Sequence, residues 1–329
     1  MKKTTVIAIK FFICAAIIFM LQKDSKATLY SINAPMSGAQ ENPPVAGGSG
    51  TFTGTYNSVT KIISYTITFS VTGVTTAGHF HGPAAVGSNA GVQQGFTGLP
   101  LSVSSGSFTS ASTALTATQE TQLLSGLWYA NIHSSTFGGG AIRGQLFPLA
   151  ISTLNLSCLI EGLYNSVSNT MIGDTVTVNL RSKVSPFTLI SSSKTFLNSS
   201  GTSVVNFTNA VNGTDYYIQI LHRNALETYS GLPFSFTSNA GSYDFTTAAS
   251  QALGNNLALK GTEYCNYSGD TDHNGIIDLS DLIYVFNDGN NFITGYTISD
   301  IDGDGSVNLT DVLIVYNDAN LFVTAVVPS

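Results

Sequence analysis

The feature of this 329-residue chain that most restricts its fold is a duplicated acidic segment near the C-terminal end. Residues 269–281 recur as residues 299–311, and the thirty-residue register continues through Phe292 and Phe322. Similarity at a fixed period over such a length means that a whole supersecondary unit is repeated. Residues 263–329 are therefore predicted to be a small α-helical module with two equivalent halves.

Both copies carry the ligand pattern of a calcium loop. Oxygen-bearing side chains occupy loop positions 1, 3, 5, 9 and 12, and glycine occupies position 6, where the chain must turn sharply. Mg²⁺ is the weaker candidate because it demands a stricter octahedral geometry and retains waters. We predict two Ca²⁺ ions. The first would be held by Asp270, Asp272, Asn274, the Ile276 carbonyl, Asp278 and Asp281, and the second by Asp300, Asp302, Asp304, the Ser306 carbonyl, Asn308 and Asp311.

Each loop is followed by apolar residues at helical spacing. The two sets are Leu282, Val285 and Phe286, then Val312, Val315 and Tyr316. This pattern predicts two short amphipathic helices whose apolar faces pack together. Because closely spaced carboxylates repel one another without a cation, we expect calcium binding and folding of the module to be coupled.

The repeat resembles the type I dockerin family, whose loops also carry Asp at position 12, as Asp281 and Asp311 do here. The resemblance implies that positions 10 and 11 of each loop contact a cohesin-type partner, which designates Leu279, Ser280, Leu309 and Thr310. Basic residues common after the loops of cellulosomal dockerins are absent from residues 287–292 and 317–322. A role in stability or surface attachment is therefore an equal alternative.

Residues 28–149 alternate strand patterns with Gly-rich turns, which predicts a β-sandwich. This segment resembles the CHRD family, named for chordin, in three motifs in family order. They are Ser37-Gly38-Ala39-Gln40-Glu41-Asn42-Pro43-Pro44-Val45, Gly78-His79-Phe80-His81-Gly82-Pro83, and Asn131-Ile132-His133 followed by Ile142-Arg143-Gly144-Gln145-Leu146. The resemblance implies a domain type and no defined activity.

Three of the five histidines of the chain lie in these motifs. His79 and His81 share one face of a strand because they are two residues apart, and His133 lies in another predicted strand. Imidazole suits copper and zinc, so His79, His81 and His133 are a candidate transition-metal site. The alternative is that they stabilise the sandwich by hydrogen bonds to Glu41, Asn131 or the backbone. We also expect Arg143 to pair with Glu41.

Residues 150–262 contain further alternating segments and predict a second β-sandwich, so the fold class is mainly β with two sandwiches before the helical module. Four aromatic residues, Tyr216, Tyr217, Tyr229 and Phe234, are predicted to be core residues, with sugar stacking as the alternative. Cys158 and Cys265 flank this segment. A disulfide and two separate buried thiols remain open alternatives.

The N-terminal residues have the three parts of a secretory signal, which we assign to residues 1–27. Lys2 and Lys3 precede an apolar run over residues 11–21, and small residues follow up to Ala27. The alternative, a retained anchor, would need about 20 apolar residues. We expect export, no transmembrane segment after cleavage, and a secreted or cell-surface location.

Composition excludes several functions. The formal charge of −7 and only 12 Lys and Arg argue against nucleic acid binding. No nucleophile motif is present, and Glu41 and Glu120 are the only acidic residues in 28–149, so we predict no enzyme activity.

We expect an exported binding or structural protein with a cell-surface or cohesin-type protein, or a polysaccharide, as partner. The alternatives are a cohesin-docked accessory of a polysaccharide-degrading system and a copper- or zinc-binding protein.

Overall fold

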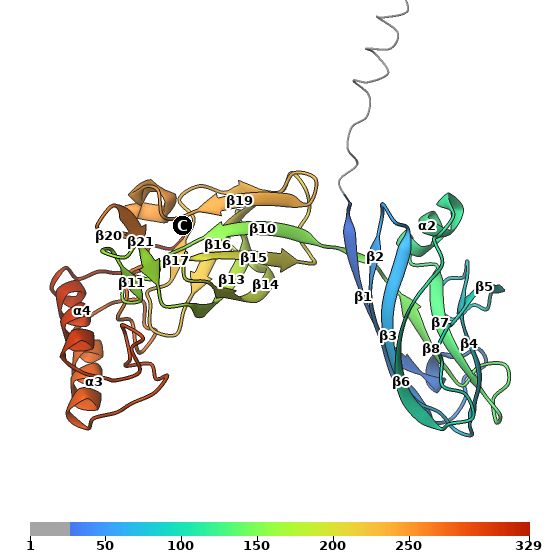
Figure 1. Cartoon of the computed structure of the whole chain (residues 1–329). Helices are drawn as coiled ribbons and strands as arrows, with labels where there is room; N and C mark the ends of the chain where they lie inside the picture. The colour runs from blue at the N-terminus through green and yellow to red at the C-terminus, as the bar shows by residue number, and fades with distance from the viewer. Residues whose placement is uncertain (1–26) are drawn as a thin grey trace, which may run out of the picture. The chain divides into compact units, whose positions relative to one another are not determined.

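The computed structural model describes residues 27–329 (Figure 1). The chain is mainly β, and it divides into two compact units, one ending at Pro148 and the other running from Leu149 to Ser329. The predicted signal peptide lies outside the described residues, except for Ala27. Within residues 27–329, no helix has the length and apolar character needed to cross a membrane.

The first unit is built on one antiparallel sheet with the strand order β5-β4-β7-β8-β1-β2-β3-β6. Its elements are β1 (Leu29–Ser37), a 3-10 helix η1 (Gly38–Gln40), β2 (Ser49–Asn57), β3 (Ile62–Ser70), β4 (Thr75–His81), β5 (Val92–Gly95), β6 (Ser105–Ala111), α2 (Ala117–Leu124), β7 (Trp128–Ser134) and β8 (Ile142–Leu146).

This sheet curls around its own core. Alternate residues of β3, such as Tyr65 and Ile67, point inward with the aromatic side chains of other strands. The rings of Tyr65 on β3 and Phe80 on β4 lie 5.2 Å apart although four strands separate β3 from β4 in the sheet order. The strands thus form one continuous sheet whose two halves face each other, rather than the two separate sheets we expected.

The second unit begins at β9 (Leu149–Ala150) and contains several small sheets and two helices. The remaining elements are β10 (Ser152–Ser157), β11 (Tyr164–Asn165), β12 (Thr170–Met171), β13 (Asp174–Ser182), β14 (Leu189–Leu197), β15 (Thr202–Phe207), β16 (Asp215–Leu221), β17 (Thr228–Tyr229), β18 (Phe234–Ser235), β19 (Ala240–Asp244), η2 (Ala249–Gln251), η3 (Leu253–Asn255), β20 (Ala258–Lys260), β21 (Glu263–Cys265), α3 (Leu279–Asn290) and α4 (Leu309–Asn320).

Two of these sheets, β15-β10-β19 and β14-β13-β16-β17, enclose a shared apolar core. Of the four predicted core aromatics, Tyr216 and Tyr229 are buried, whereas Tyr217 and Phe234 are only partly buried. Cys158 and Cys265 are free, buried thiols of the same core. Burial raises the pKa of both thiols, that of Cys265 to about 12, so neither is a reactive thiolate at neutral pH.

The C-terminal repeat packs directly against these sheets within the second unit (Figure 1). Leu226, from the segment between β16 and β17, belongs to the small core that Val285 of α3 and Val315 of α4 form. Gly162 lies so close to Ile301 of the repeat that a Cβ would collide with its carbonyl. The predicted boundary between residues 262 and 263 falls inside the β20–β21 hairpin, so no linker separates the segments.

Asp318 on α4 is a buried carboxyl group at this contact, 3% exposed. Burial and the neighbouring Glu161 raise the pKa of Asp318 to about 9, although Lys260 opposes the shift. The folded chain therefore holds a proton that the unfolded chain releases near the ordinary Asp pKa. The unfolded state binds fewer protons between these values, so this group lowers the free energy of unfolding as pH rises.

We expect Asp318→Asn to remove this pH dependence. The variant should already exceed the free energy of unfolding of the native chain near pH 5, which lies above the ordinary Asp pKa, and exceed it by more at pH 8, with the difference growing by up to about 1.4 kcal/mol per pH unit. Denaturant unfolding at both pH values in saturating Ca²⁺ measures it. Asp215→Asn, which removes a partly exposed carboxylate, is the control, and parallel pH profiles for native and Asp318→Asn proteins would contradict the assignment.

Candidate functional site

The first acidic loop gathers three of its predicted ligands around one point. Oxygen atoms of Asp270, Asp272 and Asp281 all lie within 4.8 Å of one another. Asp272 also accepts hydrogen bonds from the backbone and side-chain nitrogens of Asn274, at 3.0 and 2.9 Å. Gly275 has φ of 82°, which a residue with a side chain rarely adopts.

The second loop, thirty residues later, brings together loop positions 1, 3 and 5, whereas the first loop brings together positions 1, 3 and 12. Oxygens of Asp300, Asp302 and Asp304 lie within 4.8 Å of one another. Gly305 has φ of 86°, and its N–H donates to Asp300 at 3.3 Å, as the N–H of Gly275 donates to Asp270 at 3.2 Å. The two copies therefore share backbone conformation as well as sequence.

Asp278 and Asn308, the predicted ligands at loop position 9, are the N-caps of the helices that follow. Their side chains accept from the N–H groups of Ser280 and Thr310, at 2.7 and 2.8 Å. Asp281 completes the capping box on α3 by accepting from the Asp278 N–H at 3.0 Å. Asp311 does the same on α4. Loop positions 9 and 12 thus also fix where each helix starts.

Each acidic loop pairs with the segment that follows the helix of the other half of the repeat, and the two loops do not pair with each other. An isolated β-bridge joins Ile276 of the first loop to Thr324 after α4, and another joins Ser306 of the second loop to Thr294 after α3. These positions are related by the same thirty-residue shift. Each predicted carbonyl ligand, Ile276 and Ser306, is therefore positioned by the other half of the repeat.

The donor set fits a hard cation. The Oδ1 atom of Asp270 is buried and has no hydrogen-bond partner, an arrangement that costs about 1–3 kcal/mol if nothing binds there. Burial and the nearby Asp281 raise the pKa of Asp270 to about 6. Burial also raises the pKa of Asp300 and of Asp311. A divalent cation among these oxygens would provide a partner for Oδ1 of Asp270 and would offset the cost of ionising the buried carboxyl groups.

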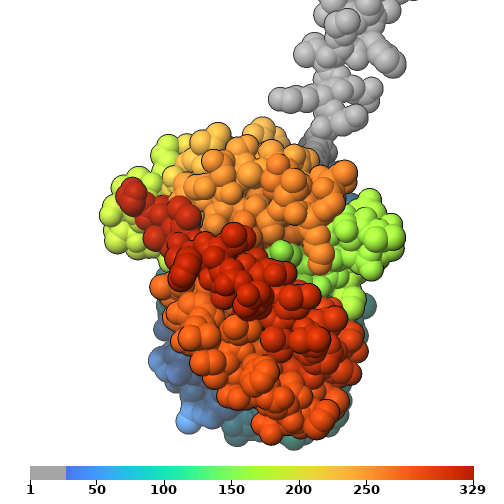
Figure 2. Space-filling model, turned by 90° about the vertical axis from the view of Figure 1, so that its left-hand side faces the viewer, coloured from blue at the N-terminus to red at the C-terminus, as the bar shows by residue number. Residues whose placement is uncertain are grey.

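The four predicted docking residues, Leu279, Ser280, Leu309 and Thr310, are all exposed at the starts of α3 and α4. The helices, at the left edge of Figure 1, face the viewer in Figure 2. Further exposed apolar side chains continue the row at helical spacing, which the sequence argument missed. The complete apolar stripe consists of Leu279, Ile283 and Phe286 on α3 and Leu309, Leu313 and Tyr316 on α4.

Phe286 and Tyr316 were expected to bury between the helices, and this is wrong, since they are 52% and 50% exposed. Val285 and Val315 are fully buried, and Leu282 and Val312 are partly buried against the same core. The apolar face of each helix is wider than the contact between the helices, so its outer edge is left at the surface.

The three histidines of the first unit lie on the outer face of the curled sheet. In the β4–β7 pairing, His79 is opposite Asn131 and His81 is opposite Tyr129, while Ala77 is opposite His133. Phe80, between the two histidines, points to the core. The shared strand face that the His-x-His spacing predicts is thus present, and His133 joins it from β7.

Each histidine is held by a specific contact. Nδ1 of His81 lies 3.0 Å from the Ala90 carbonyl, and Nδ1 of His133 lies 2.9 Å from the Gly138 carbonyl. Nδ1 of His79 lies 3.2 Å from Nε2 of His133. Nε2 of His81 is buried and has no hydrogen-bond partner. Burial lowers the pKa of His79 and of His81, which favours neutral imidazoles.

A loop after β4 covers this face, which is why an outward-facing histidine is buried. The Ser88 carbonyl accepts from Arg143 at 2.7 Å, and the Ala90 N–H donates to the Tyr129 hydroxyl at 3.1 Å. The Tyr129 ring is sandwiched between His81, stacked at 5.0 Å, and the Arg143 guanidinium, 3.5 Å from the ring centroid. No sequence signal identified Tyr129, because its partners come from a loop without periodicity.

The expected pairing of Arg143 with Glu41 is wrong, since no ion pair joins them among the described residues. Glu41 instead accepts from Asn131 at 3.2 Å. Burial raises the pKa of Glu41 to about 7, against the lowering effects of Arg143 and Asn131. Its Oε1 atom is buried without a partner.

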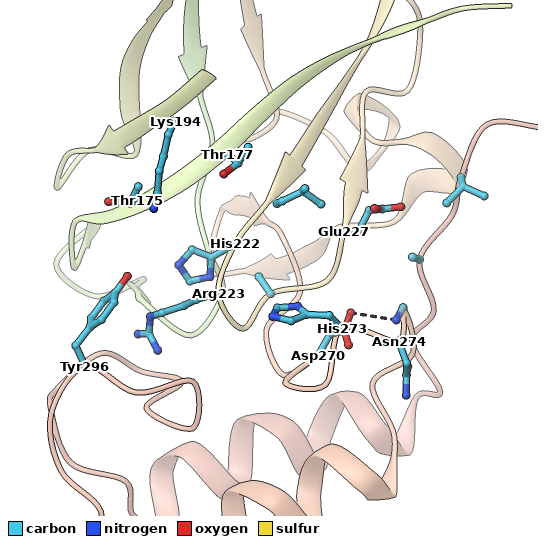
Figure 3. A pocket seen from close by; sticks show the side chains of 15 residues that line it. Thr175, Thr177, Lys194, His222, Arg223, Glu227, Asp270, His273, Asn274 and Tyr296 are labelled. Atoms are coloured by element: carbon cyan, nitrogen blue, oxygen red, sulfur yellow. Dashed lines mark hydrogen bonds between the residues drawn. The ribbon is translucent and has the colours of Figure 1, made fainter. Parts of the chain in front are cut away.

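A pocket of about 750 Å³ lies between β13, β16 and the first acidic loop of the second unit (Figure 3). His222, Arg223 and Tyr296 are on one side, and Asp270 and His273 on the other. Asp270 is both a predicted calcium ligand and part of the wall, which connects the pocket to the loop.

Beside this pocket, Asp174 at the start of β13 contacts the repeat through Tyr296. Its carboxylate accepts from His222 at 3.1 Å, from Arg223 at 3.0 Å and from the Tyr296 hydroxyl. Burial pushes the pKa of Asp174 upward, but the hydrogen bonds from His222 and Tyr296 outweigh it and hold the pKa below its usual range. Asp174 therefore stays ionised and paired in the folded chain.

Removing this carboxylate should loosen the attachment of the repeat. We expect Asp174→Ala to lower the free energy of unfolding of the second unit by about 3–5 kcal/mol, because the buried His222 and the partly buried Arg223 lose their partner. Asp215→Ala is the matched control, since it breaks the more exposed Lys183–Asp215 pair and should cost less than about 1 kcal/mol. Equal losses in denaturant unfolding would refute the role of Asp174.

Comparison with known proteins bears on the first unit. No curated protein and no solved structure matches the chain. Residues 32–146 match the family model of the CHRD domain, which confirms the resemblance that the three motifs indicated.

Proposed function

We propose that this chain is an exported, non-enzymatic binding and structural protein whose C-terminal repeat is a dockerin-like module folded around two Ca²⁺ ions. The observation that carries the proposal is the convergence of acidic oxygens in two loops of matching backbone geometry. The orphaned, buried Oδ1 of Asp270 supports a bound cation at the first loop.

Calcium would act here as a structural ion. The loops supply only oxygen ligands, and positions 9 and 12 also cap α3 and α4. An ion in each loop would hold the start of each helix and, through the reciprocal bridges, the end of the other half. The ions would therefore stabilise the face of the repeat that carries the apolar stripe.

The apolar stripe supports a protein partner. Six exposed apolar side chains at equivalent positions of two helices form a surface with approximate twofold repetition. Exposed apolar patches on soluble proteins mark interaction sites. A cell-surface protein is the partner class we propose, which makes the repeat an attachment module.

The same stripe favours a second candidate, a cohesin-docked accessory of a polysaccharide-degrading system. In that case Leu279, Ser280, Leu309 and Thr310 would contact the cohesin. The missing basic residues after each loop weigh against this candidate. Polysaccharide binding by the second unit would suit either role, and export rests on the sequence of residues 1–27.

The calcium sites can be tested by removal of the ion. We expect the chain to retain two Ca²⁺ per molecule and lose both to a chelator, with a loss of about 2.7 kcal/mol per site when free Ca²⁺ is 100 times the dissociation constant. Asp272→Ala and Asp302→Ala should each remove one ion. Elemental analysis and calorimetry measure both effects.

Asp215→Ala, a carboxylate outside the loops, should leave both ions bound. A chain that retains no Ca²⁺, or a thermal unfolding curve that does not respond to the chelator, would be incompatible with the proposed module.

The docking surface can be tested with a recombinant type I cohesin and substitutions in the stripe. If the second candidate is right, binding needs Ca²⁺, and the double variant Leu279→Asp/Leu309→Asp abolishes it, because an unpaired carboxylate in an apolar interface is costly. Each single variant keeps one intact half and should lose less than about 10-fold in affinity.

Val184→Asp, at an exposed apolar residue between β13 and β14, is the matched control. Saturable cohesin binding that survives the double substitution would place docking elsewhere, and absence of binding would remove the cohesin-docked candidate.

A further inference from the structure

We propose that His79, His81 and His133 form a three-imidazole site for one divalent transition metal ion of the zinc and copper class, with a coordination position left open to solvent. The site lies in the first unit and is independent of the calcium proposal for the C-terminal repeat. Its three side chains come from the neighbouring, hydrogen-bonded strands β4 and β7.

The hydrogen bonds fix which nitrogen of two of the rings can bind a metal. A carbonyl oxygen only accepts, so Nδ1 of His81 and Nδ1 of His133 must each carry the hydrogen that they share with Ala90 and Gly138. Their Nε2 atoms then carry lone pairs. Metal-binding histidines usually donate their other N–H to a carbonyl or carboxylate in this way.

The distances suit a common ion. Two imidazole nitrogens at about 2.0–2.1 Å from a tetrahedral ion lie about 3.3 Å apart. Nδ1 of His79 and Nε2 of His133 are 3.2 Å apart, and one ring nitrogen from each of the three histidines falls within 4.8 Å of the others.

His81 provides the observation that a purely structural cluster does not explain. It is 8% exposed, and its Nε2 atom is buried without a partner. A hydrogen bond between His79 and His133 would satisfy those two rings and still leave the lone pair of His81 unused. A metal ion bound by all three histidines would be coordinated by this lone pair of His81.

The ligand set also indicates the class of metal. The cluster contains imidazole nitrogens and no carboxylate, which suits Zn²⁺ or Cu²⁺ and not Ca²⁺ or Mg²⁺. His79 and His133 are only partly buried, so solvent or an external ligand can reach the ion. Tyr129 stacks on His81 and holds the buried ring in place. Three protein ligands with an open position are typical of reactive rather than closed structural sites.

The experiment uses the chain from Thr28 to Ser329, loaded with Ca²⁺ so that the acidic loops are saturated. Zn²⁺ or Cu²⁺ is added in turn, the protein is desalted, and retained metal is measured. We expect one ion per chain, a rise in the thermal unfolding temperature, and, for Cu²⁺, an electron paramagnetic resonance spectrum with nitrogen hyperfine splitting.

His79→Gln is the decisive variant, because its amide can still donate to Nε2 of His133 while a metal ligand is lost. We expect affinity to fall by more than about 100-fold, since even outer hydrogen-bond partners of a ligand are worth about 10–100-fold. His133→Ala should have the same effect. Unfolding of both variants in metal-free buffer shows whether the fold is kept.

His273→Asn, at an exposed histidine of the other unit, is the matched control and should retain the ion. The proposal is overturned if the native chain retains no Zn²⁺ or Cu²⁺, or if a folded His79→Gln/His133→Ala double variant binds as tightly as the native chain.

Discussion

Burial of carboxylates is the constraint on which the second unit depends. The chain has 19 acidic residues, and Asp174, Asp270, Asp281, Asp311 and Asp318 are among those buried in this unit. A buried charge is costly unless it is paired, hydrogen-bonded or neutralised. Asp174 is paired with Arg223 and His222, and Asp318 keeps a proton. The loop carboxylates receive backbone N–H groups and, in our proposal, calcium.

Several of these buried carboxyl groups also form the contacts that join the repeat to the β-sheets. Asp174 reaches Tyr296 between the two halves of the repeat, and Asp318 meets the segment that contains Glu161. Asn224 donates to the carbonyls of Ile298 and Asp300, at 3.1 and 3.0 Å. The acidic groups therefore both build the loops and attach them, so the repeat and the sheets behave as one packed unit.

The sequence predicted the local features well and the distant ones poorly. The glycine turns at Gly275 and Gly305 and the short helix after each loop follow from spacing within one segment. The reciprocal β-bridges could not be predicted in this way. A periodic pattern specifies which residues share a face of an element, but it does not specify which other element that face contacts. The exposure of Phe286 was missed for the same reason. The outer edge of an amphipathic helix is buried only if another element covers it.

In the first unit, too, local features were predicted from the sequence and long-range contacts were not. A two-residue spacing placed His79 and His81 on one strand face, yet the burial of His81 depends on the loop that carries Ala90. Arg143 was expected to pair with Glu41 because the two are among the few charged residues of the domain, but Arg143 instead stacks on Tyr129 and donates to the Ser88 carbonyl. Charge alone therefore did not identify its neighbours.

The reciprocal bridges also impose an order of assembly. Ile276 in the first loop pairs with Thr324, and the Ala325 N–H donates to the Gly275 carbonyl at 2.8 Å. A chain that emerges from the ribosome N-terminal end first thus contains its first loop long before the strand that closes it. The first loop can therefore pair only after residues 324 and 325 have been made, whereas the second loop pairs with Thr294, which precedes it in the chain.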